Sequence, residues 1–542
     1  MTQHDSGMKE RIKQSPKASL YWFKKFVQLW SLQTLTDLPD RLRNLWQKLI
    51  GSYWFIPTAC VLAGILLAPL LIAIDHQFDS KAIKEIGIAF TGNDDTARAI
   101  VTSIAGAVLG VAGTTFSITI AVLSMASSQF GPRLLRNFLT DTSNQFVLGA
   151  FIGTFSYSLL ILKSIYQSDV ASGIPQLAIT FAIMMAIVCA LLLVYFVQHM
   201  VHSIQASHVI QGASNDAISN IHYWYRTYCD TEHQHHVAES EDIDDYCYWH
   251  KIPIYAPVSG YLEQLYTESL VTLAKDYGGV IEMYTHLGQF VTDRNVVGHF
   301  YQRPAKHASH IERTRTAHLG IAPRPVDSVF WQRFATSLHI ERRRSHSNDI
   351  GYSLSQMTEI AIRALSPGIN DPKTAVNCVQ SLTVCLSVMM RRQPPSPYHF
   401  YIPSRDYDQT PIVANEPRPA ILAVVARSPT ISDFISTSLG EIRHYAMADL
   451  MVLKALCRAM VDLNYARVND AQRQSLLHEL GLIERAGRDN LGYTELVTDL
   501  EAMCRQARQF INTKGSRREN FVYVSKFDAH VRKQLRRQFR ES

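Results

Sequence analysis

The chain has 542 residues, of which 47% are hydrophobic and 18% are charged, and its formal net charge is +6. That length predicts two or more domains. The positive charge is modest and gathers at the two ends, which argues against a nucleic-acid binder and fits ends that lie near anionic lipid headgroups. The eight cysteines show no CxxC spacing, and we expect them to stay reduced in a cytoplasmic domain.

Four apolar runs are each long enough to cross a bilayer core, which needs about 20 residues. They cover residues 53–74, 99–126, 146–165 and 176–200. None resembles a cleaved signal peptide, because a polar and basic segment precedes the first run and no small-residue cleavage site closes it. We therefore predict a four-helix transmembrane domain over 53–200, preceded by a basic segment over 1–52. Buried core helices of a large soluble protein are the alternative.

The placement of Lys and Arg predicts the orientation in the membrane. The segment 1–52 is rich in both, the loop 75–98 is mixed and carries several Asp, and the loop 127–145 carries Arg133 and Arg136. This pattern predicts that both termini and the residues after 200 are cytoplasmic.

The second apolar run carries small or hydroxyl side chains at alternating steps of three and four. These steps put them on one face of a helix, with Ile, Val and Leu on the other faces. The residues of this small-residue stripe are Ser103, Gly106, Gly110, Thr114, Ser117, Ala121, Ser124 and Ser128. Two interpretations stay open. The stripe either lets neighbouring helices approach closely or lines a narrow wet path at the axis of a homo-oligomer.

A Gly-Pro pair and two arginines follow the second apolar run. Gly131-Pro132 is expected to kink or stop the helix, which would place Arg133 and Arg136 at the cytoplasmic membrane surface. There they could anchor to headgroups or surround a pore mouth. No Asp, Glu, Lys or Arg lies deep within a predicted span, and this argues against a proton-coupled pump.

After the fourth span, residues 201–250 read as a helical extension followed by a loop rich in His and acidic residues. The loop matches no standard zinc spacing, so we predict a surface loop and no metal, with metal binding as the weaker alternative. Residues 251–302 alternate strands with one short helix and resemble a small barrel-sandwich of the biotinyl–lipoyl kind. The Lys that would carry an attached cofactor is not evident, so we predict a β-rich, barrel-like shape without a cofactor.

Residues 325–513 are mainly helical in pattern, and 514–542 form a basic tail that either attaches to the membrane surface or is solvated. Between two helices lies ALSPGINDPKTAV, which we call the helix corner (residues 364–376). Gly368 is expected to take a positive φ and close the first helix. Asn370 or Asp371 is expected to cap the second helix, with Pro372 in its first turn.

The helix corner contains more polar residues than a turn requires. A purely structural turn and a ligand-binding loop both remain open. The candidate ligand residues are Arg363, Ser366, Gly368, Asn370, Asp371 and Thr374.

Four stretches of the sequence resemble one family. They are TTFSITIAVLSMASSQFGPRLLRNFLTD, APVSGYLEQL, IAIRALSPGINDPKTAV and EIRHYA. Over about residues 40–510 the chain resembles the bacterial membrane proteins grouped as domain-of-unknown-function family twenty-two fifty-four. The resemblance implies a bacterial inner-membrane protein of this architecture. It implies no reaction and no catalytic residues.

The expected fold is therefore an α-helical membrane domain of four transmembrane helices. It is followed by a cytoplasmic α+β domain, mostly helical, with a small β-rich barrel-like subdomain. Since no Walker A loop, GxSxG, HExxH or Rossmann fingerprint is present, we do not expect an enzyme. We predict a homo-oligomeric channel-like or transport-like protein with a cytoplasmic regulatory domain. The alternative is a membrane-anchored sensor or scaffold that binds a small ligand or a partner. The expected partners are the lipid bilayer and further copies of the chain, with the small ligand or ion unidentified and no nucleic acid.

Overall fold

The chain divides into two compact units in a computed structural model. The first unit comprises Met1–Leu123 and Leu135–Val201, and the second comprises Ser124–Leu134 and His202–Ser542. The structure describes residues 52, 54–77, 90, 92–131, 141–167, 175–225, 246–303, 325–344, 349–401, 421–466 and 468–513. The predicted tail, the basic segment before Ser52, Arg133, Arg136 and the His-rich part of the loop before Tyr246 lie outside these residues.

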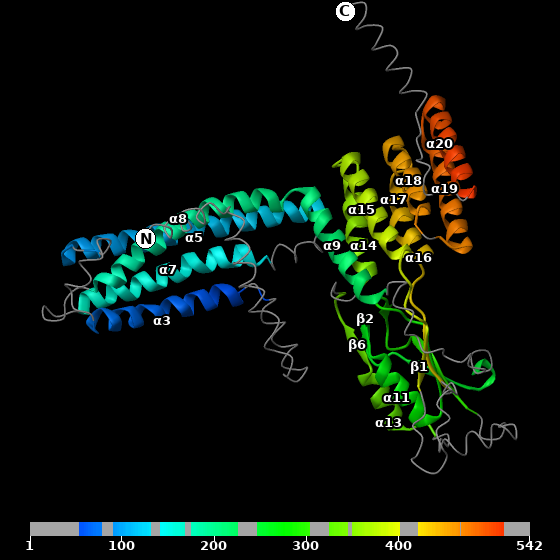
Figure 1. The fold of residues 1–542 in the computed structure, drawn as a ribbon, viewed down its shortest axis with the longest axis horizontal. Coiled ribbons are helices and arrows are strands. Elements are labelled where there is room, and N and C mark those ends of the chain that lie inside the picture. Colours follow the sequence, from blue (N-terminus) through cyan, green and yellow to red (C-terminus); the bar gives the residue numbers. More distant parts are fainter. Residues whose placement is uncertain are drawn as a thin grey trace, which may run out of the picture. The chain divides into compact units, whose positions relative to one another are not determined.

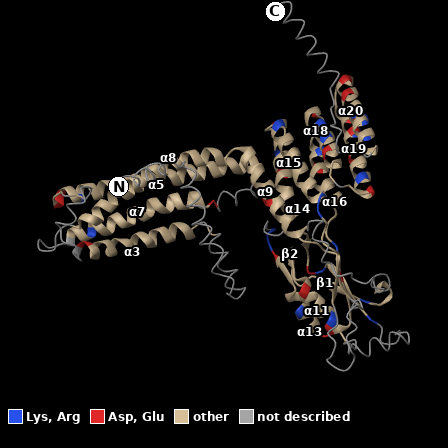
Figure 2. Cartoon of the chain, viewed as in Figure 1, with Lys and Arg blue, Asp and Glu red and all other residues tan. Residues whose placement is uncertain are grey.

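The first unit is built on four long helices that run side by side (Figure 1). They are α3 (Phe55–Gln77), α5 (Asp94–Phe130), α7 (Thr142–Gln167) and α8 (Gln176–Ser203). All four are long and apolar enough to cross a membrane, which confirms that each of the four predicted apolar runs forms a long helix. Their charged residues gather near the helix ends (Figure 2). This distribution suits a hydrocarbon environment, in which a charge at mid-depth is costly.

Glycines bring α3 and α7 into close contact. A Cβ atom added to Gly64 of α3 would lie 2.5 Å from the carbonyl oxygen of Gly153 in α7. A Cβ atom added to Gly153 would lie 2.8 Å from the carbonyl oxygen of Cys60. Gly149 and Gly153 form a GxxxG pair, the pattern that allows two membrane helices to approach closely. The close small-residue packing in this unit therefore involves α3 and α7.

Gly153→Ala is expected to destabilise the first unit by about 1–3 kcal/mol, because the added methyl group forces α3 and α7 apart. Thermal denaturation in detergent measures this as a lower melting temperature. Gly113→Ala is the matched control, since nothing lies within 4 Å of a Cβ atom at Gly113. Equal melting temperatures for the two variants would contradict the packing described here.

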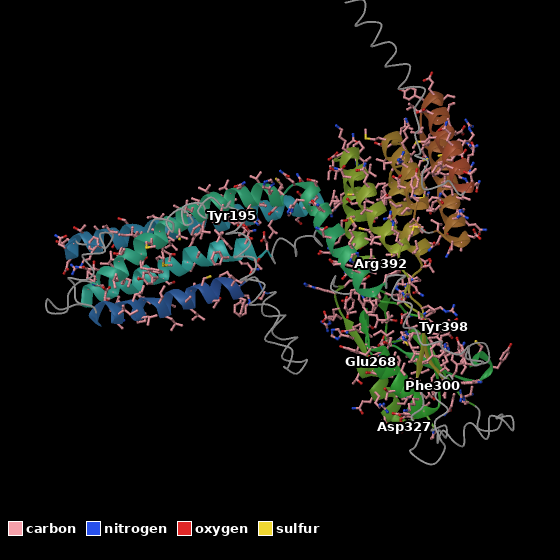
Figure 3. All side chains as sticks on the ribbon, in the orientation of Figure 1. Tyr195, Glu268, Phe300, Asp327, Arg392 and Tyr398 are labelled. Atoms are coloured by element: carbon pink, nitrogen blue, oxygen red, sulfur yellow. The ribbon has the colours of Figure 1, made fainter. Side chains whose placement is uncertain are left out.

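Polar contacts fasten both ends of the four-helix unit. The carboxylate of Asp75, at the end of α3, accepts hydrogen bonds of 3.0 Å from the backbone N–H groups of Leu177 and Ala178 in the first turn of α8. A carboxylate is favoured there because the free N–H groups of a helix start carry partial positive charge. At the other end, Oδ2 of Asp141, the residue just before α7, lies 2.6 Å from Nε2 of His199 in α8. The ring of His199 stacks on Tyr195, which is labelled in Figure 3.

The second unit contains a helical part in which neighbouring helices pack in sequence (Figure 1). Here α9 contacts α14 and α15, α15 contacts α18, and α18 contacts α19 and α20. Short polar residues cap several of these helices, among them Asp349 on α14, Asp371 on α15 and Asn469 on α19. The bounds are α9 (Ala206–Trp224), α14 (Ile350–Ala364), α15 (Pro372–Met390), α16 (Ile431–Ile435), the π-helical η3 (Ser436–Gly440), α17 (Glu441–Tyr445), α18 (Leu450–Asn464), α19 (Asp470–Asn490) and α20 (Thr494–Asn512).

The rest of the second unit is built on two sheets. One has the strand order β1-β5-β3-β8-β7 and the other the order β4-β2-β6. The strands are β1 (His250–Tyr255), β2 (Gly260–Leu265), β3 (Gly279–Met283), β4 (Phe290–Val291), β5 (Val296–Gln302), β6 (Leu338–Glu341), β7 (Tyr398–Tyr401) and β8 (Ile421–Ala426). The helices beside them are η2 (Tyr246–Tyr248), α11 (Thr267–Tyr277) and α13 (Ser328–Thr336).

The core between the five-stranded sheet and its helices is apolar. Phe300 of β5, labelled in Figure 3, packs with Leu273 of α11 and Phe330 of α13. The predicted barrel-like subdomain is not confirmed, because the strands in the described part of the chain form two open sheets. β8 pairs in parallel with β3, and this places a strand from far along the chain inside the sheet, between β3 and β7. Alternation within residues 251–302 could not reveal that pairing.

Candidate functional site

The small-residue stripe lies on the side of α5 that its neighbours leave uncovered. The buried side of α5 carries Val101, Val108 and Ala112, which pack against residues of α7 and α8. Each of the eight stripe residues is exposed, from Ser103 to Ser128. A helical repeat places this face on the opposite side of α5 from the buried one. Contacts within the described protomer therefore do not explain the stripe.

The glycines of the stripe give the same result. Nothing lies within 4 Å of a Cβ atom added at Gly106 or Gly110. By contrast, the glycines of α3 and α7 are covered by backbone. The small side chains on α5 thus serve no close contact among the described residues, and their face is open to lipid, water or another copy of the chain.

The hydroxyl groups of the stripe are partly satisfied by the helix itself. Four of the stripe's five hydroxyl groups donate to a backbone carbonyl three or four residues earlier, which leaves each hydroxyl oxygen able to accept a further hydrogen bond. The bonds run from Ser103 to Ala99 (2.7 Å), Thr114 to Val111 (2.9 Å), Ser117 to Gly113 (3.0 Å) and Ser128 to Met125 (2.8 Å). The stripe therefore presents a weakly polar surface that carries no charge.

The helix α5 is longer than a bilayer requires. Its 37 residues span about 55 Å, against about 30 Å for a bilayer core. Its last turns, from Ser124, group with the second unit, and Ala126 and Phe130 are buried there. One continuous helix thus carries the stripe and also belongs to both compact units.

Arg363 of α14 holds the carboxyl end of α5. Its Nη1 atom donates to the carbonyl oxygens of Ser128 (3.0 Å) and Ser127 (3.4 Å). The Ser127 carbonyl also accepts from the backbone N–H of Gly131 (3.1 Å). Both carbonyls lie in the last turn of the helix, where carbonyl groups carry partial negative charge. A guanidinium group is therefore well matched to this position. We call this contact the α5–Arg363 clasp.

Gly131 lies directly against the clasp. It has a φ of +104°, a value that strains any residue with a Cβ atom, and such an atom would lie 3.3 Å from Nε of Arg363. The helix ends at Phe130, as the Gly-Pro pair predicted. The contact with Arg363 was not predicted, because nothing in the local sequence indicates which distant residue covers a helix end.

The helix corner is built largely from its own hydrogen bonds. Asp371 caps α15 by accepting from the backbone N–H and from Oγ1 of Thr374 (3.2 and 2.6 Å). The bond from Oγ1 of Thr374 holds the pKa of Asp371 below its usual value. Ser366 donates through Oγ to the carbonyl oxygen of Arg363 (2.6 Å). The capping role predicted for Asp371 is confirmed, and so is the place of Pro372 in the first turn.

The predicted conformation of Gly368 is wrong. The positive φ in the helix corner belongs to Asn370 (+50°), and Gly368 is not among the described glycines with a positive φ. The chain therefore reverses immediately before α15. Asn is the residue other than Gly that most readily takes this conformation. Asp371 and Thr374 are partners of each other, and Ser366 bonds to the carbonyl of the neighbouring Arg363. The structural interpretation therefore accounts for these three polar residues.

Next to the helix corner, α14 buries polar atoms that lack partners. Oγ of Ser353 and both amide atoms of Gln356 have no hydrogen-bond partner within the described part of the chain, although these residues are 0% and 1% exposed. The helix α14 contacts the π-helical η3 and α17. π-helical turns occur frequently at functional sites. Sequence periodicity placed Gln356 on a helix but gave no sign of this burial.

Gln356→Met is expected to raise the free energy of unfolding by about 1 kcal/mol, since the change removes a buried amide that has no partner and keeps the side-chain volume similar. Chemical denaturation of the purified protein measures the change. Gln380→Met, at an exposed position of α15, is the control and should leave stability nearly unchanged. A loss of stability in Gln356→Met would contradict this expectation.

Three of the sequence stretches that carry the family resemblance meet in this region. SSQFG ends α5, IAIRALSPGINDPKTAV forms the end of α14 and the start of α15, and EIRHYA begins α17. Arg363 contacts the first stretch, and α14 contacts α17. These distant stretches therefore contribute to one region of the second unit.

Comparison with known proteins agrees with this architecture. A family model described as "Predicted membrane protein (DUF2254)" matches residues 50–462, which confirms the expected family. Uncharacterized proteins of Mycobacterium bovis and Mycobacterium tuberculosis are each 28% identical to the chain over 489 residues, covering 89% of this chain and 86% of the relative. No solved structure matches the chain.

Proposed function

Because the chain belongs to the DUF2254 family of predicted membrane proteins, we propose that it is a homo-oligomeric, channel-like protein of the bacterial inner membrane. Its small-residue stripes line a narrow central path, one stripe from each copy. Both termini and the second unit are cytoplasmic, and the second unit regulates the path through the α5–Arg363 clasp.

The uncovered stripe is the observation that carries this proposal. A small, hydroxyl-bearing face on a membrane helix is expected to contact another helix or water, since lipid contact favours bulky apolar side chains. In the protomer this face meets neither α7 nor α8, which pack on the opposite side of α5. A single helix cannot enclose a path, so several copies must contribute. The absence of ionisable groups from the stripe favours passive passage over proton coupling.

The α5–Arg363 clasp supports the regulatory part of the proposal. A shift of α14 would pull on the last turn of α5, because Arg363 bonds to the carbonyls of that turn. Since α5 is one continuous helix, such a pull reaches the stripe without an intervening flexible loop. This is a route by which an event in the second unit changes the width of the path.

The Ser117→Cys variant tests the central path. The full-length protein is reconstituted in liposomes and treated with a water-soluble thiol reagent. Peptide mass spectrometry then measures how much of the cysteine at this position has been modified. If the stripe lines a wet path, Ser117→Cys reacts readily, whereas Leu109→Cys, at a 48% exposed position on another face of α5, faces lipid and reacts slowly.

Equal and slow labelling of both variants would overturn the water-lined path. That result would favour the second candidate function, a membrane-anchored sensor or scaffold. In that case the stripe packs against another helix, and the clasp is a structural contact within the second unit.

A further inference from the structure

The five-stranded sheet buries a carboxylate on the face that lies opposite its apolar core. Glu282 of β3 pairs with His299 of β5 and with Val425 of β8, so it occupies the middle of the sheet. Its side chain is only 10% exposed. One carboxylate oxygen, Oε2, accepts hydrogen bonds from the hydroxyl groups of Tyr301 (3.0 Å) and Tyr284 (3.3 Å).

Aromatic rings surround this carboxylate. The ring centroids lie 5.1 Å apart for Tyr246 and Tyr301, 6.1 Å for Tyr301 and His299, and 5.2 Å for His299 and Tyr284. The outermost ring, that of Tyr284, is 45% exposed, so the cluster is accessible from solvent at one end. The faces of aromatic rings attract cations.

Glu282 contributes a carboxylate to this ring cluster. Burial raises the pKa values of Tyr246 and Tyr301, which keeps both phenols protonated. Burial and the nearby Lys251 lower the pKa of His299, which keeps this ring neutral near pH 7. A buried carboxylate among neutral rings creates a local preference for a positively charged group.

Two cations of the described residues, Arg427 and Lys251, approach this cluster only loosely. Nη2 of Arg427 lies 3.7 Å from Oε1 of Glu282, beyond hydrogen-bond distance, and its side chain is 72% exposed. Nζ of Lys251 lies 5.9 Å from the ring centroid of Tyr301. Within the described residues, Oε1 of Glu282 accepts no hydrogen bond. It therefore retains its lone pairs for a donor from elsewhere.

We propose that the cluster of Glu282, Tyr284, His299 and Tyr301 binds a small primary alkylammonium ligand. The ammonium group donates hydrogen bonds to Oε1 of Glu282, and its alkyl chain lies against the ring of Tyr284. A primary ammonium fits better than a quaternary one, because the free carboxylate oxygen needs an N–H donor. The ligand displaces the exposed guanidinium group of Arg427. This site is independent of the small-residue stripe and of the α5–Arg363 clasp.

The test uses the full-length protein in detergent at pH 7, with n-butylammonium as the probe and ligand-observed NMR as the measurement of affinity. Glu282→Gln should weaken binding at least about tenfold, since it removes the charge and keeps the shape. Arg427→Gln should tighten binding a few-fold, since it removes the competing cation. Because the Arg427 side chain is exposed, this second variant stays informative even if Glu282→Gln loses stability.

Two control ligands separate the contributions of the positive charge, the N–H donors and the alkyl chain. Tetramethylammonium has the charge without N–H donors, and n-butanol has the alkyl chain without the charge. Both should bind more weakly than n-butylammonium. The proposal is overturned if either control binds as tightly as the probe, or if Arg427→Gln weakens binding. It is also overturned if Glu282→Gln binds the probe like the wild-type protein.

Discussion

Gly110→Trp is expected to lower flux through reconstituted protein by about tenfold or more, because a large ring then projects from every copy into a narrow path. Gly110 is the third of the eight stripe residues, and nothing lies within 4 Å of a Cβ atom at this position among the described residues. The substitution should therefore leave the fold of each protomer intact. Liposome flux assays with small ions and neutral solutes measure the effect, alongside the melting temperature of the same preparations.

Leu109→Trp is the matched control for this prediction. It adds the same ring one residue earlier, at an exposed position on a different face of α5. We expect normal flux from this variant, since the added bulk faces lipid. If Gly110→Trp and Leu109→Trp conduct equally well, the stripe does not line the path.

Arg363→Met is expected to loosen the last turn of α5 without unfolding the protein. The substitution removes two hydrogen bonds from a charged donor to the carbonyls of Ser127 and Ser128, and such bonds contribute about 1.5–3 kcal/mol before discounting for partial exposure. A local loss of about 1.4 kcal/mol corresponds to roughly tenfold faster amide exchange. Hydrogen–deuterium exchange of residues 126–131 measures this change.

Two further variants separate the clasp from a general effect of charge. Arg363→Lys keeps the charge but loses the planar fork of donors, so exchange should rise to an intermediate rate. Arg391→Met removes an exposed Arg at the end of α15 and should leave exchange at residues 126–131 unchanged. Unchanged exchange in Arg363→Met would mean that the last turn of α5 does not depend on the clasp.

Local sequence signals explain which features could be predicted. Long apolar runs predicted the four long helices of the first unit, Gly131-Pro132 predicted the end of α5, and the Asp371-Pro372 pair predicted the start of α15. Each of these depends on neighbouring residues and on backbone chemistry. The GAFIG segment at 149–153 carried a further signal of this kind, since its two glycines predict a close helix contact.

Features that depend on distant residues were not predictable. The α5–Arg363 clasp joins residues 235 positions apart, and β8 joins β3 across the intervening helices. The burial of Gln356 and Glu282 likewise follows from packing against remote elements. The positive φ at Asn370 was missed because Gly368 was the more permissive residue nearby. The turn before α15 requires the positive φ at position 370, two residues after Gly368, and position 370 is an Asn.

The mass of the purified particle in lipid nanodiscs, measured by native mass spectrometry or light scattering, tests the central proposal most directly. Since each copy contributes one small-residue stripe, a central path requires a ring of roughly four or more copies. The account predicts such a ring for the wild-type protein. A monomer or a simple dimer would contradict it, because neither can enclose a path with one stripe per copy.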